Sequence, residues 1–245
     1  MDCHICNKPL RGRYCFDSWG HKMCESHLNN DAVFCASCTG FTKKDIILSD
    51  GRVLCKVCES IAVKPNDPVD LIKRTVINNL IKVGFSDLRL EDIDSIQVVS
   101  VEKLAELRKK PIDPNNKGMT FSRVSSSFGL LSGKKQEMTH TIYMLSYLTK
   151  IQFAGTLAHE MLHAWQIQNG VKMSPKLTEG LCNMGAYLMY DSLGSSLTKI
   201  YLKQLHESPD LIYGDGFREV YAHYERLGWA DLIKYVRENK LVDGY

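Results

Sequence analysis

The chain has 245 residues, of which 44% are hydrophobic and 24% charged, and its formal net charge is +3. This length and composition suffice for a small N-terminal module followed by one further domain of ordinary size. No apolar run reaches the roughly eighteen residues that a membrane helix needs, and basic and acidic residues nearly balance over the first sixty positions, which opposes binding to nucleic-acid phosphates. We therefore expect no membrane and no nucleic acid among its partners.

Cysteine usage defines the N-terminal part of the chain. Eight of the nine cysteines lie in the first sixty residues, and most form pairs with a two-residue spacing. Read in chain order, the pairs give two four-ligand sites with similar gaps of seventeen and sixteen residues between their halves. Such thiolate-rich sites are structural, because each supplies folding free energy to a segment too small to form its own core. The predicted ligands are Cys3, Cys6, Cys24 and His27 for a first structural zinc, and Cys35, Cys38, Cys55 and Cys58 for a second.

Two alternatives concern these residues: another histidine as ligand of the first site, and disulfide bonds in place of zinc binding. His21 could act with Cys24 in place of His27, but the more equal gaps favour His27. The second alternative is a disulfide framework, and residues 1–20 contain no apolar signal sequence that would accompany it, so we expect reduced thiols and a cytoplasmic location. Small cores for the two zinc units are predicted from the aromatic residues Tyr14, Phe16, Trp19, Phe34 and Phe41.

The rest of the chain predicts a mixed α+β domain. We place the boundary near residue 64, which gives residues 1–63 to the zinc module and residues 64–245 to the second domain. An amphipathic helix is expected over residues 69–83, with Leu71, Val76, Leu80 and Ile81 facing inward. The following elements are a strand at 95–101, a helix at 101–110, a loop at 111–117, and strands at 119–125, 127–131 and 140–145.

The most informative segment runs from His159 to His163 and reads His-Glu-Met-Leu-His inside an apolar, helix-period stretch over residues 152–169. Residues four apart on a helix lie one above the other, so both imidazoles can reach a single ion. Glu160 then points beside that ion and can act as general base on a zinc-activated water. This pattern is typical of zinc hydrolases, whereas the alternative is a pair of core histidines satisfied by backbone carbonyls.

A catalytic zinc needs a third protein ligand, and Glu179 is the best candidate. It lies near the start of a second predicted helix, which Ser174 caps and which has a proline at its first position. The alternative is a carboxylate that only complements the helix dipole. Asn183, one turn later, could accept a hydrogen bond from a ligand histidine, and Cys182 is interpreted as a small core residue.

Four segments together resemble the DA1-type LIM-domain peptidases: Asp17-Ser18-Trp19-Gly20, residues 154–165 around the histidine pair, residues 179–182 beginning with Glu179, and residues 213–218 from Tyr213 to Arg218. The resemblance covers nearly the whole chain. It implies a LIM-like double zinc module fused to a zincin-like, gluzincin-type peptidase, with Glu179 as third zinc ligand. Plant members of the family are ubiquitin-activated endopeptidases, so the resemblance also implies ubiquitin-linked regulation. The sequence departs from the gluzincin pattern at Asn183, where an aspartate is common.

These observations predict a zinc-dependent peptidase acting on protein or peptide substrates, with one catalytic and two structural zinc ions. Tyr213 and Arg218, in the glycine-marked segment, are the first candidates for an additional donor to the oxyanion, ahead of His206 and His223. The strand at 139–146 is expected to offer an exposed edge to an extended substrate. The alternative function is a catalytically silent interaction scaffold, which we would expect to have lost Glu160 or a zinc ligand.

Overall fold

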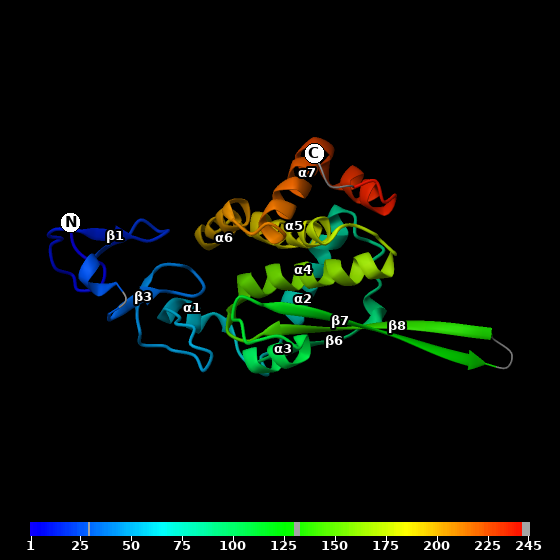
Figure 1. Ribbon diagram of the computed structural model, residues 1–245, viewed down its shortest axis with the longest axis horizontal. Helices are drawn as coiled ribbons and strands as arrows, with labels where there is room; N and C mark the ends of the chain where they lie inside the picture. Colours follow the sequence, from blue (N-terminus) through cyan, green and yellow to red (C-terminus); the bar gives the residue numbers. More distant parts are fainter. Residues whose placement is uncertain (29, 130–132, 242–245) are drawn as a thin grey trace.

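Two small hairpin units form the N-terminal end of the molecule (Figure 1). The computed structural model describes residues 1–28, 30–129 and 133–241. In each unit two short antiparallel strands pair, β1 with β2 and β3 with β4. The bounds are β1 Tyr14–Phe16, β2 Lys22–Cys24, a 3-10 turn at Glu25–His27, β3 Ala32–Phe34, β4 Phe41–Lys43 and α1 Lys56–Ser60.

The cores of these units differ from the sequence prediction. Phe41 is 4% exposed and packs beside Cys3, Met23 and Ala32. The cysteine clusters themselves fill the centre of each unit, so few other side chains are enclosed. The aromatic-core prediction is therefore wrong for four residues, whose exposures range from 38% to 67%: Tyr14, Phe16, Trp19 and Phe34.

The larger part of the chain is a three-stranded sheet covered by helices, which confirms the mixed α+β class. Its strand order is β6-β8-β7, with β6 and β8 parallel and β7 and β8 antiparallel. The strands are β6 Ile93–Val99, β7 Gly118–Gly129 and β8 Gly133–Leu145, and the helices are α2 Asp70–Val83, α3 Val101–Arg108, α4 Lys150–Gln168, α5 Pro175–Leu193, α6 Ser196–Glu207 and α7 Tyr213–Arg237. A 3-10 turn at Leu90–Asp92 precedes β6, and Gly228 interrupts α7.

Helix α4 lies between the sheet and α5, and α7 packs on α5 (Figure 1). This central position explains why α4 is apolar on most of its surface, with Phe153, Leu157, Met161 and Trp165 fully enclosed. The side chain of Thr149 caps its first turn by accepting from the Gln152 N–H. Helix α5 likewise begins where the sequence predicted, with Pro175 as its first residue after the Ser174 cap. Both predicted core helices are thus present.

Two details of the predicted elements are corrected. In α2, Val76 and Leu80 are buried, but Leu71 and Ile81 are 71% and 45% exposed, because only one narrow stripe of this helix contacts the core. Strand β7 continues through residue 129, so the predicted strands at 119–125 and 127–131 form one element as far as the described residues reach, and 130–131 lie outside them.

The expected substrate edge is also wrong. Strand β8, which contains residues 139–145, lies in the middle of the sheet and pairs on both sides. Its parallel pairing with β6 is a long-range contact that hydrophobic patterning does not reveal. The two outer strands are β6 and β7, and of these β7 contacts α4, so a ligand that lies beside α4 would meet the edge of β7.

The second hairpin unit contacts the larger α+β part directly. Ala62–Val63 forms β5, which pairs antiparallel with β9, Leu148–Thr149, immediately before α4. The Ser37 hydroxyl lies 2.8 Å from the Tyr201 hydroxyl, and Arg52 donates to the Ser146 carbonyl at 2.8 Å. Among the described residues, no helix is both long and apolar enough to cross a membrane.

Candidate metal centre and catalytic site

The N-terminal ligand pairs come together in two groups, as the spacing predicted. The ligand atoms of each group lie within 4.8 Å of one another. The Sγ atoms of Cys38 and Cys55 are 3.9 Å apart, close to the roughly 3.8 Å between two sulfurs bound tetrahedrally to zinc at about 2.3 Å. The groups are Cys3, Cys6, Cys24 and His27, and Cys35, Cys38, Cys55 and Cys58.

The structure places His27, rather than His21, in the first group. The His27 ring contacts Cys6, and its Nδ1 lies 2.7 Å from Asp31 Oδ1, an arrangement that orients a ligand histidine. His21 instead pairs through Nδ1 with Asp17, 2.9 Å away. The geometry thus favours the four ligands that the near-equal gaps favoured.

A third group lies between α4 and α5. His159 Nε2 is 3.2 Å from His163 Nε2, and Glu179 Oε2 is 3.2 Å and 3.4 Å from these two nitrogens. Two ligand atoms bound tetrahedrally to zinc at about 2.0–2.1 Å lie about 3.3 Å apart. All three separations match this value, so these residues fit a single zinc ion.

The environment of the Glu179 carboxylate also indicates a metal ligand. Its Oε2 is buried and, among the described residues, has no hydrogen-bond donor. Burial opposes ionisation of this carboxyl, but the adjacent His159 and His163 rings lower its pKa to about 2. The carboxylate is therefore charged at neutral pH and available to a cation.

Cys182 is the other donor near the histidines, with ligand atoms of all three residues within 4.8 Å of one another. Its side chain is fully buried in α5, and its Sγ accepts a hydrogen bond of 2.9 Å from Gln166 Nε2. Burial raises the pKa of the Cys182 thiol, which disfavours the thiolate that zinc requires. Glu179 is consequently the better third ligand, and Cys182 packs as the core residue that the sequence predicted.

Asn183 orients His159. Its Oδ1 lies 2.9 Å from His159 Nδ1, while its Nδ2 donates to the Tyr213 carbonyl oxygen at 2.9 Å. The second contact fixes which amide atom faces the histidine, so Nδ1 carries the proton and Nε2 is left with a free lone pair. The role that the sequence suggested for Asn183 matches this geometry.

Glu160 lies beside the three candidate ligands and is held by strand β7. The Thr120 hydroxyl lies 2.8 Å from both Glu160 Oε2 and the Glu160 carbonyl oxygen. Gly118 faces the same side chain, since a Cβ at this position would lie 2.7 Å from Glu160 Oε1 and 2.9 Å from its Cγ. Sequence reasoning missed both residues, because only the pairing of β7 with β8 brings them to α4.

The contact at Gly118 leads to a testable prediction. Gly118→Ala should push the Glu160 carboxylate out of position, and a misplacement on the order of 1 Å can cost about 100-fold in rate. We expect kcat for the peptide cleavage that the sequence predicts to fall by about that factor, with zinc content and thermal stability nearly unchanged. Kinetics combined with metal analysis would check this, and an alanine variant of full activity would contradict the packing role.

The two oxyanion candidates differ in position. Tyr213 stacks near His159, with ring centroids 6.5 Å apart, and burial followed by the Glu179 charge raises its pKa, so its phenol remains a donor. Arg218 instead donates to the carbonyls of His206 and Ser208 and pairs with Asp215. The structure thus brings Tyr213 to the site and uses Arg218 to hold the segment before α7.

The glycines around Tyr213 have a packing explanation. A Cβ on Gly180 of α5 would lie 2.2 Å from the Gly216 carbonyl oxygen, and a Cβ on Gly216 would lie 2.2 Å from the Lys176 carbonyl oxygen. Only glycine allows α5 and α7 to approach this closely. That approach places Tyr213, the first residue of α7, next to the histidine pair.

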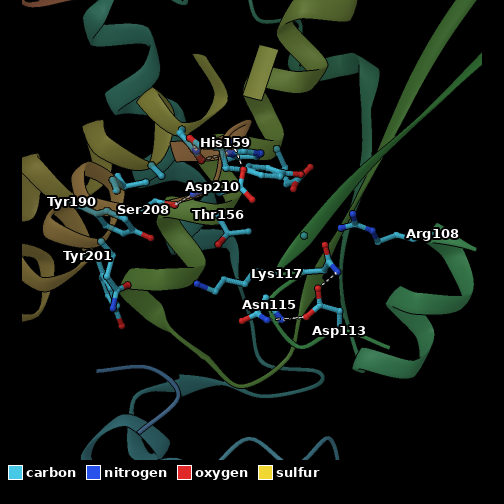
Figure 2. A pocket seen from close by; sticks show the side chains of 18 residues that line it. Arg108, Asp113, Asn115, Lys117, Thr156, His159, Tyr190, Tyr201, Ser208 and Asp210 are labelled. Atoms are coloured by element: carbon cyan, nitrogen blue, oxygen red, sulfur yellow. Dashed lines mark hydrogen bonds between the residues drawn. The ribbon is translucent and has the colours of Figure 1, made fainter. Parts of the chain in front are cut away.

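A cavity of about 430 Å³ opens beside these residues (Figure 2). His159, Glu160 and Tyr213 line it, whereas Arg218, His206 and His223 do not. The rest of the wall comes from the segment that leads from α3 into β7, which includes Lys117, and from α5 and α6, which include Tyr190, Tyr201 and Gln204. A cavity of this size can accept peptide side chains next to the candidate metal centre.

These groups define a protein with two LIM-like metal clusters and a separate histidine and glutamate site on paired helices. A family model described as DA1-like, Protein DA1, matches residues 130–198, which contain all three candidate ligands and Glu160. The resemblance of this chain to the DA1-like family is thereby confirmed.

Curated plant proteins are similar over most of the chain. Protein DA1-related 1 of Arabidopsis thaliana is 24% identical over 82% of this chain and 46% of its own length. LIM domain-containing protein HDR3 of Oryza sativa subsp. japonica is 22% identical, covering 89% and 56%, and Protein DA1 of Arabidopsis thaliana is 22% identical, covering 89% and 51%. The chain thus spans about half the length of these relatives. No solved structure is a significant match.

Proposed function

We propose that this chain is a zinc-dependent peptidase with a zincin-like catalytic domain and a LIM-like module that holds two structural zinc ions. The observation that carries the proposal is the convergence of His159 Nε2, His163 Nε2 and Glu179 Oε2 at separations of 3.2–3.4 Å, with Glu160 beside them. Three protein ligands leave a tetrahedral ion one open position, as catalysis requires. The resemblance to DA1-type peptidases supports the same function.

The residues of this chain divide the chemistry among them. Zinc in this site would supply a Lewis acid that polarises the scissile carbonyl and acidifies the attacking water. Glu160 takes the proton from that water and returns it to the leaving amine, while Thr120 keeps one carboxylate oxygen in place. The Tyr213 phenol, protonated at neutral pH, donates to the developing oxyanion.

We infer that the substrate is an extended segment of a protein or peptide. Strand β7 is the outer strand beside α4, and its first residues contact Glu160. A substrate that paired with this edge would present its backbone to the catalytic residues. Regulation linked to ubiquitin is a proposal that rests on the family resemblance alone.

Metal content tests the function. The full-length protein is expected to bind three zinc ions per chain, and a chelator that strips the partly accessible His159 and His163 site should abolish cleavage of an unfolded protein. Adding one equivalent of zinc should restore cleavage. Binding of only two zinc ions per chain would contradict the proposal and favour an interaction scaffold. Cleavage that survives removal of all zinc would contradict it as well.

A further inference from the structure

Lys117 occupies an unusual position in the cavity beside the candidate catalytic site. Figure 2 shows its side chain running into the cavity, toward the wall that carries Tyr190 and Tyr201 and away from Arg108. The residue is half-buried, although most lysines of this chain are exposed. A lysine in this place contacts whatever fills the cavity.

The backbone of Lys117 is firmly placed. Its carbonyl oxygen accepts from the Leu145 N–H at 2.8 Å, and the next residue, Gly118, packs against Glu160. The Lys117 side chain therefore begins one residue before strand β7, which supports the proposed general base, and it lines the same cavity as Glu160.

The structure provides no anion for this ammonium. Among the described residues, no carboxylate lies within ion-pair distance of Lys117. Burial first, and then the like charge of Arg52, lower the pKa of Lys117. A desolvated cation without a partner is costly, and an anion bound in the cavity would remove that cost.

The carboxylates of the cavity wall already have other donors. Asp113 accepts from the Asn115 N–H at 2.9 Å and from the Asn116 side-chain amide at 3.0 Å. Asp210 accepts from the backbone N–H of Tyr213 at 2.7 Å. Glu160, the third carboxylate of the wall, is held by the Thr120 hydroxyl at 2.8 Å. None of the three is thus within ion-pair distance of Lys117, and an anionic ligand in the cavity would fill that place.

We propose that Lys117 forms a subsite that selects a carboxylate of the substrate, either an acidic side chain close to the scissile bond or the C-terminal carboxylate of the peptide. This inference rests on the proposed peptidase function and names the substrate class for its cleft. A charge-assisted hydrogen bond between ammonium and carboxylate is worth more than a neutral one, so a carboxylate should bind about tenfold more tightly than the matching amide.

The test measures binding and does not require turnover. Zinc-loaded, full-length Glu160→Gln protein is titrated with fluorescent alanine-based decapeptides in which one Glu is moved along the peptide, each compared with its Gln twin. A second set compares a free with an amidated C-terminus. The same titrations use Lys117→Met, which keeps the apolar stem, Lys117→Arg, which keeps the charge, and Lys110→Met as control, because Lys110 is exposed and does not line the cavity.

We expect an approximately tenfold preference for the carboxylate peptide, absent in Lys117→Met, present in Lys117→Arg and unchanged in Lys110→Met. The set that shows the preference identifies the source of the carboxylate. Equal affinities throughout, a preference that survives Lys117→Met, or no peptide binding would overturn the inference. Cleavage by the wild-type protein is measured separately: cleavage without carboxylate preference refutes only the subsite, and Lys117-dependent binding without cleavage refutes only the peptidase function.

Discussion

Replacing Glu160 with glutamine is expected to lower kcat by about 10²–10⁴ while leaving zinc content unchanged. Glutamine keeps the shape of the side chain, and its carbonyl oxygen can still accept from the Thr120 hydroxyl, which lies 2.8 Å from Glu160 Oε2. The amide cannot take a proton from water at neutral pH. The loss should therefore appear in kcat, with little change in KM or in thermal stability.

Glu179→Gln is the matched control for this experiment. Both variants exchange a carboxylate for an amide, but the Glu179 oxygen lies between the two histidine nitrogens, at 3.2 Å and 3.4 Å. Its replacement should reduce the metal content from three zinc ions to two, whereas Glu160→Gln should keep three. Full activity of Glu160→Gln, or loss of zinc from that variant, would show that Glu160 is not the general base.

The features that local sequence predicted well are those that one or two helices determine. The histidine pair meets because four residues make about one helical turn, and Glu179 meets it because Ser174 and Pro175 start α5 at the right register. The cysteine groups formed for a similar reason, since each pair lies within one tight turn.

The features that sequence reasoning missed depend on contacts between distant segments. Gly118, Thr120 and Lys117 reach the site because β7 is the outer strand of the sheet, an order that hydrophobic alternation cannot reveal. Arg218 drew attention through its neighbouring glycines, but the carbonyls of the preceding segment, at His206 and Ser208, occupy its guanidinium. The positions of these four residues depend on strand pairing between distant segments and on the conformation of the loop before α7, and local sequence patterns predict neither.

Asn183 shows how the structure explains a departure from the family pattern. An aspartate at this position could still accept a hydrogen bond from His159 Nδ1. It could not donate to the Tyr213 carbonyl oxygen, as the Asn183 amide does at 2.9 Å, and would place a negative charge against that oxygen. The amide thus connects the orientation of a candidate zinc ligand with the position of the candidate oxyanion donor.

A zinc ion in the second cysteine group is expected to stabilise the α+β part of the chain far more than one in the first group. Cys58 lies in α1, directly before β5, and β5 pairs with β9 at the start of α4. The same unit contacts Tyr201 through Ser37. Binding of a structural zinc ion contributes on the order of 10 kcal/mol to folding, and loss of this ion would remove part of that free energy from a segment joined to α4.

Cys58→Ser should therefore lower the Tm by on the order of 10 °C. We expect the substitution to reduce the free energy of unfolding by about 3 kcal/mol, and each kcal/mol shifts the Tm of a chain of this size by roughly 2–4 °C. Hydrogen exchange should show reduced protection of the α4 amides. Cys6→Ser is the control: it breaks the first site, whose hairpin lies at the far end of the molecule (Figure 1), and should leave α4 protected. Equal effects of the two variants on α4 would mean that the pairing of β5 with β9 does not couple the second cysteine group to this helix.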